Sequence, residues 1–116
     1  MTDERHKLDI SSEKTEAATI VRVKGEIDLR TSPQLRKELI NLLDDAPGKI
    51  VLDLADVSYV DSSGVGTIVE LKRRVMRSKG DVILVALQQR VRSLFEITRL
   101  DKFFTLVDTV EEALET

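Results

Sequence analysis

Two adjacent hydroxyl residues, Ser62 and Ser63, stand between an aspartate and two glycines in the run Val-Asp-Ser-Ser-Gly-Val-Gly. An apolar run before them predicts a buried strand, and apolar residues at helical spacing after them predict a helix. Asp61, Ser62 or Ser63 can therefore cap that helix by accepting from its free first-turn amides. Gly64 and Gly66 leave space for a close approach. A hydroxyl at the positive end of a helix suits a phosphate, although plain N-capping also explains the serines.

Three enzyme patterns fail at this run. A nucleophile elbow needs glycine two residues before the serine, where Val60 stands before Ser62. A serine triad needs a histidine in the fold, and the only one is His6, near the start of the chain. A phosphate-binding loop of the Walker type needs lysine after its last glycine, but Thr67 follows Gly66.

A phospho-aspartate receiver is the fourth enzyme-like alternative, because Asp53 lies in a Val-Leu-Asp-Leu strand. Such chemistry needs Mg²⁺ held by further carboxylates and a basic group for the phosphoryl oxygens. No acidic pair follows the first predicted strand, and the strand predicted over residues 82–87 runs into glutamines, not lysine. We expect Asp53 to end a strand or face solvent, and the receiver stays the less favoured interpretation.

Two charged segments have a functional alternative. Glu26 and Asp28 lie in a predicted loop after Gly25 that reads as a solvated turn; alternatively, this loop lies beside Ser62 at the same edge of the sheet. The basic run at residues 72–74 fits a charged helix face, in which Lys72 extends from the apolar stripe and Glu70 pairs with a neighbouring arginine. Docking of an acidic partner is the alternative there.

Composition places the chain among ordinary globular domains. Its 116 residues suffice for one core, with 41% apolar and 34% charged residues. The net charge of −3 gives no electrostatic case for nucleic acid. With no cysteine, a disulfide framework is excluded and a reducing compartment fits. No apolar run reaches the length of a membrane span, and the polar start does not resemble a signal peptide, so we expect a cytoplasmic protein.

The pattern predicts a mixed α/β fold in the order β-β-α-β-α-β-α-β-α. Ser32 and Pro33 predict a helix start, as N-cap and first helical residue. Asp108 with Glu111 resembles a capping box for the last helix. The alternation implies parallel strands, to which an opening antiparallel hairpin is added. Strands are predicted over residues 8–12, 19–24, 50–54, 82–87 and 106–107, with helices following residues 32, 62, 91 and 108.

The strand IVLDL at residues 50–54, followed after a connector by VDSSGVG at 60–66, resembles the anti-sigma factor antagonists, which are single-domain STAS proteins. The similarity covers nearly the whole chain. The run GEID at residues 25–28 resembles a turn of that family, and FEITRL at 95–100 and DTVEEAL at 108–114 resemble its usual ending. The central motif is specific, and it lies in the predicted strand–loop–helix context.

The resemblance implies a STAS domain over residues 8–116 after a flexible leader at 1–7, and a binding switch in place of an enzyme. In this family the unphosphorylated antagonist binds an anti-sigma factor and frees the sigma factor. The anti-sigma factor is also an ATP-dependent serine kinase that inactivates the antagonist, and a serine phosphatase resets it. The antagonist itself would need no cofactor, nucleic acid or membrane, and we expect a monomer or weak dimer.

By the same resemblance the phosphate acceptor is Ser62. A STAS switch acting on a different, non-sigma output stays open within this class. The residues implied to shape the kinase-docking loop or to lie near the interface are Asp61, Ser63, Gly64, Val65, Gly66, Glu26 and Asp28.

Overall fold

The computed structural model describes residues 7–44 and 48–116; the predicted leader lies outside them except for Lys7. One five-stranded sheet forms the centre of the domain, in the order β1-β2-β3-β4-β5. The chain order of strands and helices is as predicted, with a short 3₁₀ helix in addition. The strands are β1 (Asp9–Lys14), β2 (Thr19–Ile27), β3 (Lys49–Val60), β4 (Asp81–Val85) and β5 (Thr105–Val107); the helices are α1 (Ser32–Leu43), α2 (Ser62–Arg77), α3 (Gln89–Ile97), η2 (Leu100–Lys102, 3₁₀) and α4 (Val110–Glu115).

The sheet pairing is mixed. β1 pairs antiparallel with β2, and β2, β3, β4 and β5 pair parallel in succession. The predicted opening hairpin is therefore confirmed, but its first strand extends two residues beyond the predicted end at residue 12. Glu13 and Lys14 still pair in β1, and the turn is closed by the Thr15 hydroxyl, which accepts from the Ala18 amide at 3.1 Å.

The two strands that lead to the candidate site are longer than predicted. Residues 25–27, predicted as loop, continue β2, and residues 55–59, predicted as connector, continue β3 up to Val60. Gly25 permits this extension, because it adopts a φ of +127° where the β2–β3 register shifts. The extension carries both strands to a common end at the pair Ile27 and Val60.

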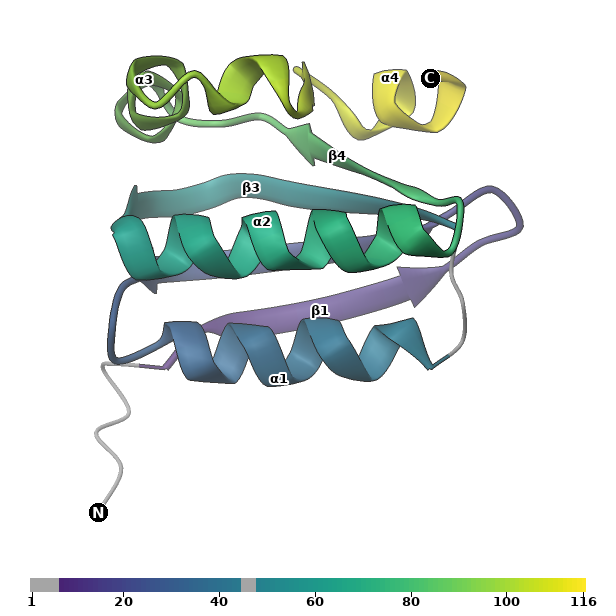
Figure 1. Ribbon diagram of the computed structural model, residues 1–116, viewed down its shortest axis with the longest axis horizontal. Helices are drawn as coiled ribbons and strands as arrows, with labels where there is room; N and C mark the ends of the chain where they lie inside the picture. The colour runs from purple at the N-terminus through teal and green to yellow at the C-terminus, as the bar shows by residue number, and fades with distance from the viewer. Residues whose placement is uncertain (1–6, 45–47) are drawn as a thin grey trace.

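Most of the core lies between the sheet and helices α1 and α2, which run side by side across one face (Figure 1). Ile68, Leu71 and Val75 of α2 belong to the apolar residues at helical spacing that predicted this helix, and they are buried there. Met76, which belongs to the same pattern, is 49% exposed. Val91 and Phe95 of α3 join the same core. A smaller cluster, which includes Val51, Ile83 and Ala113, packs α4 against the sheet.

Two predicted caps are wrong by one residue. Thr31, not Ser32, is the N-cap of α1, and its hydroxyl is used in the preceding loop instead of on the helix. Pro33 is then the second helical residue. Proline is tolerated there because the first amides of a helix have no intrahelical acceptor, so its lack of an N–H breaks no hydrogen bond. At α4 the cap is Thr109, whose Oγ1 accepts from the Glu112 amide at 3.1 Å, so Asp108 and Glu111 do not form the predicted box.

Helices able to cross a membrane are absent from the described ranges, because none of them is long and apolar enough.

Candidate functional site

The candidate site forms where β2 and β3 end together. Ile27 pairs with Val60, and the amide of the next residue, Asp61, donates to the Ile27 carbonyl at 3.0 Å. The loop after β2 is thereby brought against the start of α2. The structure therefore favours the alternative over a merely solvated turn, because the loop that contains Asp28 lies beside the start of α2 at the same end of the sheet.

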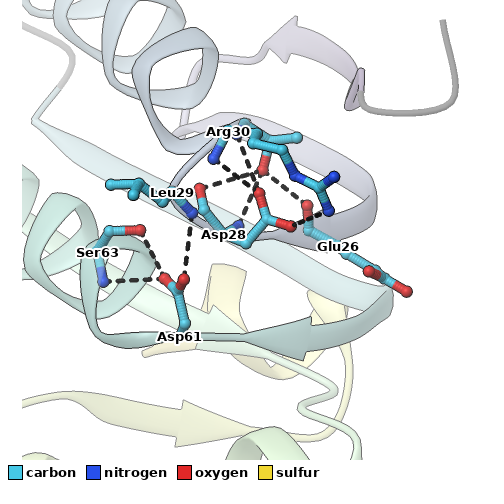
Figure 2. A network of polar contacts seen from close by, with 7 residues as sticks. Glu26, Asp28, Leu29, Arg30, Asp61 and Ser63 are labelled. Atoms are coloured by element: carbon cyan, nitrogen blue, oxygen red, sulfur yellow. Dashed lines mark hydrogen bonds and ion pairs between the residues drawn. The ribbon is translucent and has the colours of Figure 1, made fainter. Parts of the chain in front are cut away.

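Asp61 holds this junction together. Its Oδ1 accepts from the amides of Ser63, at 2.9 Å, and Gly64, at 3.1 Å, and also from the Ser63 hydroxyl. Its Oδ2 accepts from the Leu29 amide at 3.1 Å (Figure 2). One carboxylate therefore caps α2 and anchors the loop after β2. These hydrogen bonds hold the pKa of Asp61 below its ordinary value, and the bond from the Ser63 hydroxyl has the largest effect. Partial burial opposes the shift.

The structure separates the two serines. Ser63 is half-buried, and its hydroxyl is occupied by the Asp61 carboxylate. Ser62 is exposed at the first position of α2, and none of the described residues makes a hydrogen bond with its side chain. The alternative in which Ser62 serves as the N-cap is wrong, because Asp61 has that role. Ser62 is left as a solvent-facing hydroxyl at the positive end of a sixteen-residue helix.

The two glycines of the motif have different environments. A Cβ on Gly64 would lie 2.6 Å from Cγ2 of Ile27 and 2.8 Å from Cγ1 of Val60, so the first turn of α2 rests directly on the ends of both strands. A Cβ on Gly66 would meet nothing within 4 Å. Val65 is half-buried, and its amide donates to the Asp61 carbonyl at 3.0 Å. Only Gly64 is required by the packing of this turn.

The two acidic residues predicted near the interface also differ. Asp28 accepts from the amides of Arg30 and Thr31 and forms an ion pair with Arg30 at 3.2 Å. Desolvation alone would raise the pKa of Asp28. The hydrogen bonds from Arg30 and Thr31, with the charge of Arg30, outweigh it, so this pKa lies below its ordinary value. Its carboxylate therefore shapes the loop. Glu26 is exposed, its carbonyl accepts from the Thr31 hydroxyl at 2.7 Å, and its carboxylate points away from Asp61 (Figure 2).

A hollow of about 430 Å³ adjoins Ser62, and the sequence analysis did not anticipate it. Residues 59–62 line one side, and Arg90, Ser93, Leu94 and Ile97 of α3 line the other. Tyr59 and Ile97 are exposed at this hollow. Leu29 does not line it, but it is 76% exposed on the neighbouring loop, whose amide at Leu29 is bound by Asp61. An exposed apolar residue in the predicted loop was the available signal for Leu29. The approach of α3 has no local signal, because it depends on tertiary packing.

The receiver interpretation finds no support in the described residues. Asp53 lies within β3 instead of ending it, accepts from the Ala55 amide at 3.0 Å and pairs with Arg22 at 3.8 Å. No group of three or more acidic, histidine or cysteine residues that could hold a metal ion occurs in residues 7–44 and 48–116.

The basic run on α2 is largely structural. Glu70 pairs with Arg74, as predicted for a neighbouring arginine, and also with Arg36 of α1. Lys72 is buried, and its Nζ donates to Asp81 at 2.8 Å and lies 5.1 Å from the centre of the Phe103 ring. The charged-face interpretation fits these contacts, although Lys72 is more enclosed than expected.

Comparison with known proteins gives a consistent picture. The family model for the STAS domain matches residues 9–113. The anti-sigma-B factor antagonist of Staphylococcus aureus is 34% identical over 80 residues, which span 69% of this chain and 74% of that protein.

Solved structures agree. An anti-sigma factor antagonist from Mycobacterium paratuberculosis superposes with a TM-score of 0.87 at 27% identity, covering 99% of this chain and 97% of that one. The Bacillus cell fate determinant SpoIIAA in its phosphorylated form has a TM-score of 0.73 at 25% identity, covering 92% and 97%.

Proposed function

The chain belongs to the STAS domain family, and on that premise we propose that it is an anti-sigma factor antagonist controlled by phosphorylation of Ser62. In its unphosphorylated form it binds an anti-sigma factor that is also an ATP-dependent serine kinase, and the sigma factor is released. The kinase then phosphorylates Ser62 and lowers its own affinity for the product. A serine phosphatase restores the binding form. The site of action is the cytoplasm, and ATP is a substrate of the partner kinase.

The observation that carries this proposal is the difference between the two serine hydroxyls. A kinase must reach the acceptor oxygen, and Ser62 presents an exposed hydroxyl with no partner among the described residues. Ser63 would have to release its hydrogen bond to Asp61 before it could react. The phosphorylated form of the structural relative SpoIIAA supports phosphorylation as the control of this fold.

The surface around Ser62 supports a protein partner. Leu29, Tyr59 and Ile97 are large apolar residues that remain exposed close to the acceptor's loop and hollow. Exposed apolar groups rimmed by polar residues are typical of protein-binding surfaces. The proposed surface also includes residues at the start of α2 and at the end of β2. These residues are Asp61, Ser63, Gly64, Val65 and Gly66, and Glu26 and Asp28.

Phosphorylation would act on the interface, not on the fold. A phosphate adds about −1.5 to −2 charges at neutral pH. The first turn of α2 tolerates that charge, because the helix dipole is positive there. In the complex the charge would be desolvated beside Asp61, and about 2.7 kcal/mol of imperfect pairing already lowers affinity about a hundredfold.

The experiment uses three full-length baits in native lysate: wild type, Ser62→Ala and Ser62→Asp. We expect an ATP-dependent serine kinase to be retained by Ser62→Ala and lost with Ser62→Asp. After addition of ATP, intact-mass measurement should find one phosphoryl group on the wild type and none on Ser62→Ala. A sigma factor released from the same complex identifies the output.

Ser11→Asp is the matched charge control, because Ser11 is exposed on the edge strand β1 and belongs to no part of the site. It should retain the kinase. Equal capture by Ser62→Ala and Ser62→Asp would contradict the proposal. Release of a partner other than a sigma factor would favour a STAS switch with a non-sigma output.

A further inference from the structure

The hollow beside Ser62 contains a charged residue of α3 for which the proposed function has no role. Arg90, the second residue of α3, lines this hollow together with Ser62 and Asp61. It is exposed, and within the described ranges its guanidinium has no ion pair or hydrogen bond. Three arginines elsewhere in the domain, by contrast, have ion-pair partners: Arg30 pairs with Asp28, and Arg36 and Arg74 pair with Glu70.

The residues that line this hollow include one anion and one cation, and a phosphate on Ser62 would add further negative charge. Asp61 contributes a carboxylate whose lowered pKa keeps it ionised at neutral pH. A phosphate on the neighbouring Ser62 would therefore add charge of the same sign next to an existing negative charge. Arg90 is the one cation among the residues that line the hollow. A guanidinium can donate two parallel hydrogen bonds to phosphate oxygens, which makes it a better phosphate partner than an ammonium group.

We propose that Arg90 binds the phosphate of phosphorylated Ser62 across this hollow. The inference rests on Ser62 being the phosphorylated residue, as in the proposed function, and it adds how the modified form is held. The phosphate then lies in the hollow between the start of α2 and helix α3, with Arg90 covering it. Ser93, which also lines the hollow, can donate a further hydrogen bond.

This arrangement has a consequence for partner binding. When Arg90 and the phosphate occupy the hollow, the apolar side chains of Tyr59 and Ile97 lose the space between them as a docking surface. Phosphorylation then removes a complementary shape in addition to introducing charge. Without Arg90 the phosphate would remain hydrated and mobile, and the hollow would stay open for part of the time.

The test is a ³¹P NMR titration of the full chain with phosphoserine installed at position 62 during synthesis. Three proteins are compared: the otherwise unchanged chain, Arg90→Gln and Arg92→Gln. Arg92 lies on the same helix but does not line the hollow, so its variant controls for the loss of one positive charge from α3.

A nearby guanidinium stabilises the dianion, so we expect the second phosphate pKa to be about 0.3–0.5 units higher in Arg90→Gln than in the other two proteins. The difference should shrink in high salt, because the groups are exposed to solvent. Equal pKa values in all three proteins would overturn the inference. Because the phosphoserine is installed without a kinase, a lysate that lacks a kinase for Ser62 would contradict the proposed function and leave this measurement intact.

Discussion

Asp61 and Leu29 are 32 residues apart in the sequence, and the amide of Leu29 donates to Oδ2 of Asp61 at 3.1 Å. The same carboxylate caps α2 through its other oxygen. The position of the exposed Leu29 loop is therefore fixed by the residue that precedes Ser62, the proposed phosphate acceptor. The proposed binding surface and the proposed modification site share this one carboxylate as their anchor.

Acidification should remove the contribution of Asp61 to stability. Its folded pKa is lowered, so the unfolded chain binds the proton at higher pH than the folded chain does. The contribution is therefore complete above the unfolded pKa of about 4 and is lost as the pH falls through the lower folded value. Urea unfolding of the wild type and Asp61→Asn, from about pH 7 to about pH 2.5, measures this.

At neutral pH we expect Asp61→Asn to be less stable by about 1 kcal/mol, because an amide nitrogen cannot accept from Leu29 while the amide oxygen can still cap the helix. The two curves should converge at the acid end. A difference that stays constant over the whole range would show that the charge of Asp61 has no part in stability.

The two serines should differ in stability as they do in environment. Ser63→Ala removes the hydroxyl that donates to Asp61, so it should lower the unfolding free energy by about 1 kcal/mol. It should also raise the pKa of Asp61 toward its ordinary value. Ser62→Ala removes a hydroxyl that faces solvent and should change stability by less than about 0.5 kcal/mol. Equal losses in chemical denaturation would be inconsistent with the hydrogen bonding described.

The two glycines make a matched pair for packing. Gly64→Ala places a methyl group against Ile27 and Val60, and overpacking of this kind costs about 1–3 kcal/mol. Gly66→Ala meets open space within α2 and should stabilise by up to about 1 kcal/mol through helix propensity. Thermal unfolding separates the two. If Gly64→Ala proved as stable as Gly66→Ala, the first turn of α2 would not rest on the strand ends as described.

Leu29 should matter for partner capture and not for folding. Its side chain is mostly exposed, so Leu29→Ser should leave the unfolding midpoint within error and reduce retention of the partner kinase at least about tenfold. Met76→Ser is the control, since Met76 is also exposed but lies near the other end of α2 from Ser62. Titration of the purified partner against both variants measures the difference. Equal affinities would exclude the Leu29 loop from the interface.

The order of strands and helices could be predicted from the sequence, because periodicity and breakers report directly on local structure. Strand lengths could not. Residues 55–59 have a mixed polar pattern that resembles a connector, yet they continue β3 because β2 offers them a pairing edge. The caps at Thr31 and Thr109 were missed by one residue, since neighbouring residues offer competing hydroxyl or carboxyl groups and residue type alone does not say which of them makes the local hydrogen bonds.

The candidate site was predictable in its residues but not in their roles. The motif contains Asp61 and both serines, and spacing alone allowed any of the three to cap α2. The choice depends on the amide of Leu29, which only the β2–β3 register brings within reach. Arg90 and the hollow beside Ser62 could not be predicted, because α3 reaches that place through packing of Val91 and Phe95 into the core.

The paired ends of β2 and β3 have a consequence for how any modifying enzyme must recognise this chain. The Ser62 hydroxyl owes its exposure and direction to a strand pair and a helix turn that exist only in the folded domain. A short peptide copied from this segment would lack both, since an isolated helix of this length is marginal in water. We therefore expect a kinase that acts on the proposed acceptor Ser62 to recognise a folded conformation instead of a linear consensus, and we expect unfolded or nascent chains to escape modification.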